Sequence, residues 1–309
     1  MRARITQLTL AHLLLAVGAL VMIYPLLYIV FASLNSQSDF VRSSGILPVP
    51  PQFTLKNYAV ILHPKVFPLI LTSVGVTMLR IAWFILTNGA VAILLGYVFA
   101  RLRFRGKNFV FLVLLASMLV PGIVFQVPLF VMMARWPLAG GNDLLGQGGS
   151  GLLNSIFALL MPGMINVYFV FLLRQTFFSI PIDFEEAARI EGASFLQILR
   201  HVYWPMLKPT MAVVAITTTV ANWNDYVWPL MVVSGNHDLW PTSMLFQRLM
   251  SGGLPTEVAQ SIATSSAQTL SDIPLILTFG VVATIPMVIF FFFFQRGFME
   301  GLQGGGLKG

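Results

Sequence analysis

The chain has no cysteine among its 309 residues, and only 9% of its residues are charged. Without cysteine there is neither a disulfide framework nor a thiolate metal site. A soluble domain carries about 25% charged residues, so the composition excludes an ordinary soluble protein. What takes the place of charge is hydrophobic sequence, which makes up 57% of the chain. The composition is that of a membrane protein.

Motifs for covalent chemistry are also missing. A phosphate-binding loop is absent, because Gly106-Lys107 is followed by Asn108 and no glycine lies five residues upstream of Gly106. Neither a Ser-His-Asp arrangement nor a metal-binding cluster can be recognised. The four histidines are scattered, at His12, His63, His201 and His237. We expect no enzyme activity, no metal and no cofactor, and any ATP-derived energy must come from another subunit.

The net charge of +7 could suggest a nucleic acid partner. The basic residues, however, punctuate hydrophobic segments instead of forming one face. We therefore expect the lipid bilayer as the partner and no nucleic acid. The charges set the topology.

Hydrophobic runs predict an all-α, polytopic membrane fold with six transmembrane helices. A helix rising about 1.5 Å per residue needs roughly 20 residues to cross ~30 Å of hydrocarbon. The first run, 5–34, is too long for a signal peptide and lacks a cleavage site, so we expect an uncleaved span. The other spans are expected at about 71–99, 109–133, 153–177, 209–233 and 275–294. The chain then divides into an N-terminal helix with an external loop (1–66), a core (67–296) and a glycine-rich tail (297–309).

With six spans, both termini lie on the same side of the membrane. Most basic residues fall on that side: Arg2, Arg4, Arg101, Arg103, Arg105, Lys107, Arg174, Arg189, Arg200, Lys208, Arg296 and Lys308. Fewer fall on the other side: Arg42, Lys56, Lys65, Arg135 and Arg248. By the positive-inside rule, the termini and the 178–206 loop are cytoplasmic in a multi-pass protein of the inner membrane.

The 178–206 loop is the one long charged, amphipathic stretch. Asp183 followed by Glu186 forms a capping-box pattern, and so does Ser194 followed by Gln197, so two short helices are predicted. Gly192 suits the left-handed end of the first helix, and Pro205 is expected to stop the second. Their outer face is expected to carry the charged residues Glu185, Glu186, Arg189 and Glu191.

Two intramembrane polar features stand out. The tetrad Asn222-Trp223-Asn224-Asp225 lies inside the fifth predicted span, where a carboxylate and two amides are costly. It lines a solute path, with Trp223 or Trp228 as a stacking platform, or it packs helices through hydrogen bonds. Both interpretations stay open. Arg80 lies two to three turns from the outer end of the second span, and we expect it to extend outward to the interface.

The 178–206 loop resembles the signature of inner-membrane subunits of ABC importers. That signature reads Glu-Ala-Ala, three residues, Gly, nine residues, Ile, one residue, Leu-Pro. The same spacing here gives Glu186-Ala187-Ala188, Gly192 and Val202-Tyr203-Trp204-Pro205, with Val for Ile and Trp for Leu. In the family this element is the coupling helix, which docks in a cleft of an ATPase subunit. The resemblance implies this role for Glu185, Glu186, Ala187, Ala188, Gly192 and Ala193.

Two further segments are similar to the maltose-importer type of permease. The 222–225 tetrad matches the Asn-Trp-Asn-acid pattern of sugar-importer subunits. The ending 301–309 resembles their Gly-Leu-x-x-Gly-x-x-Lys-Gly tail, which inserts between two ATPase subunits. The resemblance implies ATPase contact for Gly306, Leu307, Lys308 and Gly309. Taken without the resemblance, the same tail is typical of a disordered end.

The resemblance implies the fold of a type I ABC importer permease. The expected partners are a second permease in a heterodimer, two ABC ATPases and an external solute-binding protein. ATP would close the ATPase dimer, and the coupling helices would then rock the permeases between inward and outward openings. An ion-coupled secondary transporter, which would need an ion site, and a membrane scaffold, which would need no path, are the competing classes. The solute stays open among disaccharide, oligosaccharide, polyol and glycerol phosphate.

Overall fold

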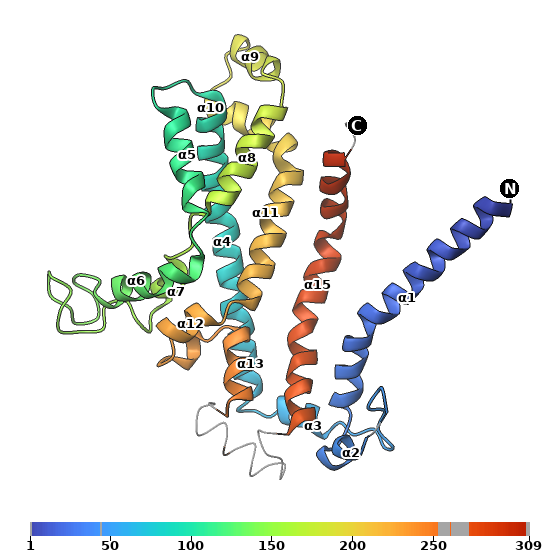
Figure 1. The fold of residues 1–309 in the computed structure, drawn as a ribbon. Helices are drawn as coiled ribbons and strands as arrows, with labels where there is room; N and C mark the ends of the chain where they lie inside the picture. The colour runs from blue at the N-terminus through green and yellow to red at the C-terminus, as the bar shows by residue number, and fades with distance from the viewer. Residues whose placement is uncertain (1, 44, 253–259, 261–271, 307–309) are drawn as a thin grey trace. The chain divides into compact units, whose positions relative to one another are not determined.

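The computed structural model describes residues 2–43, 45–252, 260 and 272–306, and within them it contains helices and no strand (Figure 1). Two compact units divide the chain, Met1–Leu71 with Leu245–Val288 and Thr72–Met244 with Ile289–Gly309. We call them the terminal unit and the central unit. The α-helices are α1 (Arg2–Ser33), α2 (Gln37–Arg42), α3 (Lys56–Ile61), α4 (Phe67–Arg101), α5 (Lys107–Ser117), α6 (Gly122–Ala134), α7 (Ile156–Leu160), α8 (Val167–Ser179), α9 (Asp183–Ile190), α10 (Phe195–Ile198), α11 (Trp204–Asn224), α12 (Val227–Val232), α13 (Thr242–Met250) and α15 (Ile273–Gly306). A π-helix, η1 (Leu199–Tyr203), and a 3-10 helix, η2 (His237–Leu239), complete the described elements.

Three described helical segments are long and apolar enough to cross a membrane: Thr9–Ser33, Phe67–Arg101 and Ile273–Phe292. Two bent pairs reach the same criterion together, α5 with α6 at 92° and α8 with α9 at 75°. The described part of the chain therefore has three such helices, or up to five if each bent pair is one span. The six-span count stays a prediction. The fifth predicted span, 209–233, is interrupted by the break between α11 and α12.

In the terminal unit, side-chain amides tie the segment that follows α1 to the end of that helix. Asn57 donates to the backbone oxygens of Ser33 at 2.8 Å and Asn35 at 2.9 Å, and Asn35 donates to Pro48 at 2.6 Å. Thr278 of α15 donates to the same Ser33 oxygen at 3.3 Å. The described residues of the loop predicted after the first span thus include α2 and α3, and hydrogen bonds hold them to α1 and α15.

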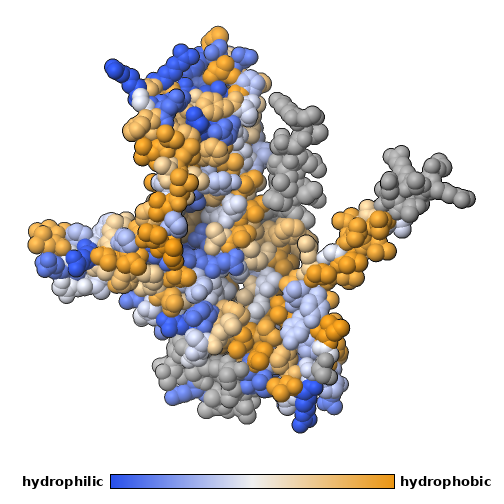
Figure 2. Space-filling model, viewed as in Figure 1, coloured by the Kyte–Doolittle hydropathy of each residue, from blue (hydrophilic) through white to orange (hydrophobic). Residues whose placement is uncertain are grey.

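In the central unit, α4, α5, α8 and α11 lie side by side (Figure 1). Their shared core is apolar and includes Leu173, Phe177, Leu207 and Val214, which are all fully buried. A Cβ on Gly96 would lie 2.9 Å from the Cβ of Leu173, so only glycine allows α4 and α8 to approach this closely. Figure 2 shows hydrophilic residues gathered at the end of this unit that carries α9, and hydrophobic ones along the helices that lead away from it.

Two more predicted spans are interrupted. The stretch 109–133 bends between α5 and α6, and 153–177 breaks between α7 and α8 around Pro162 and Gly163. Proline lacks a backbone donor, and Gly163 adopts a left-handed φ of 89°. The freed backbone oxygen of Gly163 accepts a hydrogen bond from Asn88 at 3.1 Å. These breaks place irregular backbone beside a cavity.

Candidate functional site

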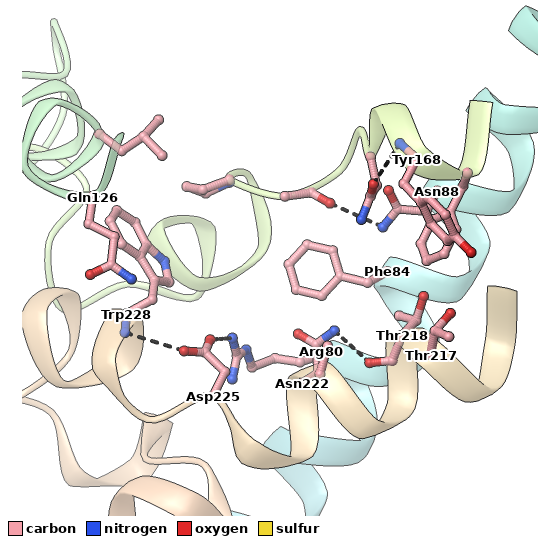
Figure 3. A pocket seen from close by; sticks show the side chains of 16 residues that line it. Arg80, Phe84, Asn88, Gln126, Tyr168, Thr217, Thr218, Asn222, Asp225 and Trp228 are labelled. Carbon is pink, nitrogen blue, oxygen red and sulfur yellow. Dashed lines mark hydrogen bonds and ion pairs between the residues drawn. The ribbon is translucent and has the colours of Figure 1, made fainter. Parts of the chain in front are cut away.

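A cavity of about 430 Å³ lies in the central unit among α4, α6, α8, α11 and α12 (Figure 3). Polar and aromatic side chains dominate its wall. The lining residues are Arg80, Phe84, Asn88, Gln126, Leu129, Pro162, Gly163, Asn166, Tyr168, Phe169, Thr217, Thr218, Ala221, Asn222, Asp225 and Trp228. Non-helical backbone at membrane depth is tolerated where it lines such a cavity, which accounts for the break around Gly163.

An ion pair in the cavity wall links α4 to the end of α11. Arg80 Nη2 lies 2.6 Å from Asp225 Oδ2 (Figure 3). The expectation that Arg80 extends outward is wrong, because its side chain is only 2% exposed and points inward to the carboxylate. A buried guanidinium is stabilised by a nearby counter-charge, and Asp225 supplies one from 145 residues away in the sequence. Asp225 itself is 30% exposed.

Several polar atoms in the wall have no protein partner in the described part of the chain. They are Nε and Nη1 of Arg80, Oδ1 of Asn88 and Oγ1 of Thr218. Each belongs to a residue that is at most 4% exposed. Buried polar atoms without partners are rare and costly, and these four belong to residues that line one cavity.

The structure divides the predicted tetrad. Asn222 and Asp225 line the cavity, whereas Trp223 and Asn224 are not among its lining residues. Asn222 donates to the Thr218 backbone oxygen at 2.9 Å, and Asn224 donates to Val220 at 2.8 Å, so both amides also satisfy their own helix. Of the two candidate aromatic platforms, Trp228 lines the cavity and donates to Ala158 at 2.9 Å.

Sequence reasoning missed the polar residues that α4, α6 and α8 contribute to the wall. These residues are Asn88, Gln126, Asn166 and Tyr168. A signal was present, since amides within apolar runs are uncommon at membrane depth and face a cavity or another helix. Only the fold shows that they meet.

The 178–206 loop forms two short helices, as predicted, with local differences. The first helix, α9, ends in a Schellman motif: Gly192, with φ of 83°, donates to Arg189, and Ala193 donates to Ala188. Ser194 is the N-cap of α10, and its backbone N–H donates to Gln197 Oε1 at 2.7 Å, as the capping box requires.

Two local predictions for this loop are wrong. Asp183 is the first residue of α9 and Ile182 is the N-cap, which forms no side-chain capping bond. Pro205 does not stop the second helix, because the chain continues from α10 through η1 into α11. The π-helix changes the hydrogen-bond register just before Pro205, and proline is tolerated in the first turn of the following helix, where its missing N–H is not needed.

Glu185 is the buried centre of the loop's attachment to α4 and η1. Its carboxylate accepts hydrogen bonds from Tyr97 at 2.8 Å, from Arg189 at 2.6 and 3.1 Å, and from Tyr203. Arg101 adds an ion pair at 3.9 Å. The prediction that Glu185 lies on the outer face is therefore wrong, since the residue is 3% exposed.

These contacts determine the protonation of Glu185. Burial alone would raise its pKa, but hydrogen bonds from Tyr203, Arg189 and Tyr97, with the charge of Arg189, lower the pKa below its ordinary value. The carboxylate is thus ionised at neutral pH and balanced by two arginines.

The rest of the predicted coupling residues lie near the outer side of the loop. Glu186, Ala187 and Gly192 are exposed, and Ala188 and Ala193 are half-buried. Two large apolar side chains of the loop, which sequence reasoning did not single out, are also highly exposed: Ile190 at 87% and Leu196 at 73%. The predicted tail contact extends beyond the described residues: Gly306 ends α15, whereas Leu307, Lys308 and Gly309 lie outside them.

The described residues include no group of three or more acidic or histidine residues that could hold a metal ion.

The family model of the binding-protein-dependent transport system inner membrane component matches residues 92–302. The chain belongs to this family. It is an ABC importer permease, a multi-pass inner-membrane protein that works with ATPase and binding-protein partners, and this assignment favours ATP-driven import over an ion-coupled carrier.

Individual relatives cover nearly the whole chain. The permease AraQ of an arabinooligosaccharide transport system from Halalkalibacterium halodurans is 28% identical, over 94% of this chain and 93% of its own. The permease LacG of a lactose transport system from Rhizobium radiobacter is 26% identical, over 94% of this chain and 93% of its own. A chain of a bacterial ABC transporter involved in importing the acidic polysaccharide alginate matches with a TM-score of 0.76 and 26% identity, covering 95% of this chain and 96% of that one.

Proposed function

We propose that the cavity forms part of the import route of a sugar or related solute. We further propose that the 178–206 loop docks on an ATPase subunit and couples ATP hydrolysis to this route. One observation carries the proposal: α4 and the segment from η1 to the end of α11 each contribute to both places. Arg80 and Tyr97 belong to α4, while Tyr203 and Asn222 lie near the two ends of the second segment.

The composition of the cavity wall suits a sugar. Amide side chains from Asn88, Gln126 and Asn222 can exchange hydrogen bonds with hydroxyl groups, and the rings of Phe84 and Trp228 offer apolar faces. Binding sites typically combine apolar surface with a few convergent polar groups in this way. The lactose and arabinooligosaccharide cargo in the names of two relatives supports the same solute class.

The exposed side of the loop suits a protein partner. Glu186 supplies charge, and the small side chain of Ala187 permits close approach, while Ile190 and Leu196 present apolar surface that a docking cleft would cover. Glu185, in contrast, faces inward and holds the loop to the rest of the central unit. Docking and anchoring are thus performed by adjacent residues on opposite faces of α9.

The two long helical segments give a physical route for coupling. From Arg80 to Tyr97 along α4 the distance is roughly 26 Å, at about 1.5 Å per residue. A helix of this length transmits a displacement of the loop as a nearly rigid body when its side chains are tightly packed, as the core around Leu173 and Phe177 is.

The remaining parts of the proposal follow the family. We infer a heterodimer with a second permease, two ATPase subunits, cytoplasmic termini, and a core of about 67–296 between an N-terminal helix (1–66) and a tail (297–309). The tail residues 306–309 are proposed to contact the ATPases, as in the maltose-importer type. The surplus of basic residues on the side of the 178–206 loop supports this orientation.

A thiol-accessibility experiment tests the route. The native chain has no cysteine, so an Asn222→Cys variant gives a clean signal in proteoliposomes that hold the assembled importer. We expect the transported sugar to protect this thiol from modification. Asn224→Cys is the matched control, because Asn224 is exposed yet does not line the cavity. Equal protection, or none, at both positions would refute the path assignment.

The same assay tests the orientation. Ser150 and Ser194 are both exposed. We expect Ser150→Cys to react with an impermeant thiol reagent from outside and Ser194→Cys to react only after the membrane is opened. The reverse labelling pattern would overturn the proposed cytoplasmic position of the loop.

A further inference from the structure

We propose that the cavity selects uncharged solutes over anionic ones, and that Asp225 sets this preference by neutralising Arg80. The inference rests on the proposed function, in which the solute passes through this cavity. The family does not decide the matter, since its members include importers named for neutral sugars and a structural neighbour that imports an acidic polysaccharide.

The charge balance of the wall is the first observation. Among the 16 residues that line the cavity, Arg80 and Asp225 alone are charged, and they form a pair at 2.6 Å. The wall therefore has no net charge. A lone guanidinium in such a place would attract a carboxylate or phosphate strongly, because it forms charge-assisted and often bidentate bonds with them. Asp225 already occupies that position (Figure 3).

The unpartnered atoms are the second, independent observation. Two of them are donors, Nε and Nη1 of Arg80; Asn88 Oδ1 is an acceptor and Thr218 Oγ1 belongs to a hydroxyl, which serves as either. A carboxylate group only accepts hydrogen bonds, so it cannot satisfy the Asn88 oxygen, and any bond from a solute to that oxygen must come from a hydroxyl. A solute hydroxyl both donates and accepts, and several hydroxyls on one ring match this mixed set.

These observations make Asp225 a specificity-determining residue. Removing its charge while keeping its shape leaves a cavity with one free cation. The variant should then take acidic solutes that the parent protein rejects. Removing Arg80 instead leaves one free carboxylate and should make the rejection of acids stronger.

The experiment measures binding to the assembled importer in nanodiscs without its binding protein, so that the cavity and not the delivery protein selects. The probes are galactobiose and digalacturonate, which differ in carboxylates, and their dissociation constants are measured by saturation-transfer NMR. We expect the parent complex to prefer galactobiose. In Asp225→Asn the ratio of affinities should shift toward digalacturonate by about tenfold or more, because a charge-assisted bond to the freed arginine is gained.

Matched variants keep the result interpretable. Asp238→Asn removes an equally charged side chain that is 77% exposed and lies outside the cavity lining, and it should leave the ratio unchanged. The double variant Arg80→Gln with Asp225→Asn restores a neutral wall and should restore the parent preference. If the Asp225→Asn complex fails to assemble, the Arg80→Gln variant tests the proposal by itself, and its affinity for digalacturonate should be lower than that of the parent complex.

Contrary outcomes are separate for the two proposals. An unchanged ratio in Asp225→Asn, or equal affinity of the parent complex for both probes, would overturn the charge selection while leaving the route intact. Binding of neither probe to the parent complex, together with an unprotected thiol at Asn222→Cys, would overturn the route itself, and the charge selection with it.

Discussion

Two buried ionic groups lie in the central unit, and their hydrogen-bonding capacity is used to very different extents. Both oxygens of Glu185 accept hydrogen bonds, from Tyr97 and Arg189 on one side and from Tyr203 on the other. Arg80 has one partnered nitrogen and two buried nitrogens without a partner. Each group joins α4 to a segment more than 80 residues away, yet the arrangement around the charge differs.

This difference in hydrogen bonding distinguishes a rigid structural contact from a binding site. A carboxylate whose two oxygens both accept hydrogen bonds from surrounding side chains holds one geometry, because any displacement breaks several bonds at once. A network with free donors and acceptors beside a cavity has capacity left for a ligand. The Glu185 cluster therefore suits transmission of movement, and the Arg80–Asp225 pair suits contact with the solute.

The largest expected effect is from Glu185→Gln. The change leaves Tyr97, Tyr203 and two arginines around an uncharged amide, and breaking one partner of a buried ionic group costs roughly 3–5 kcal/mol. We expect the thermal unfolding midpoint of the assembled complex in detergent to fall, and solute-stimulated ATP hydrolysis to fall with it.

The neighbouring residue supplies the control for this change. Glu186→Gln alters an exposed carboxylate and should change the unfolding free energy by about 0.5 kcal/mol or less. Equal destabilisation by the two substitutions would show that burial of Glu185 is not what anchors the loop.

A smaller effect is expected at the cavity when both charges are removed together. Replacing both members of a buried pair by groups of similar shape is often nearly neutral, so Arg80→Gln with Asp225→Asn should change the unfolding free energy by about 1 kcal/mol or less. Either single change should cost more, since it leaves the other charge unpaired. The three midpoints, measured side by side, check this, and a double variant less stable than both single ones would contradict it.

Sequence reasoning predicts the helical fold and the glycine-ended, capped loop because those signals are local. The left-handed turn at Gly192 and the capping box at Ser194 each depend on residues within a few positions. The role of Glu185 depends on Tyr97, 88 residues upstream, and that of Arg80 on Asp225, 145 residues downstream. In both cases the rule that a charge faces water or the interface failed, because the partner becomes visible only in the fold.

The last expected effect is a dependence of stability on acid pH that belongs to Glu185. Its pKa is lowered in the folded protein relative to the ordinary value of about 4.3. The folded state therefore binds this proton less readily than the unfolded state. The stability that the ionised carboxylate contributes is fully present above the unfolded pKa, and it is lost as the pH falls through the folded pKa.

The unfolding midpoints of the parent complex and of Glu185→Gln should thus differ most near pH 7 and approach one another below about pH 4. The Glu186→Gln control should differ from the parent by nearly the same small amount at every pH, because its carboxylate is exposed. A gap between parent and Glu185→Gln that stays constant from pH 7 to pH 3 would mean that the charge of Glu185 does not stabilise the loop.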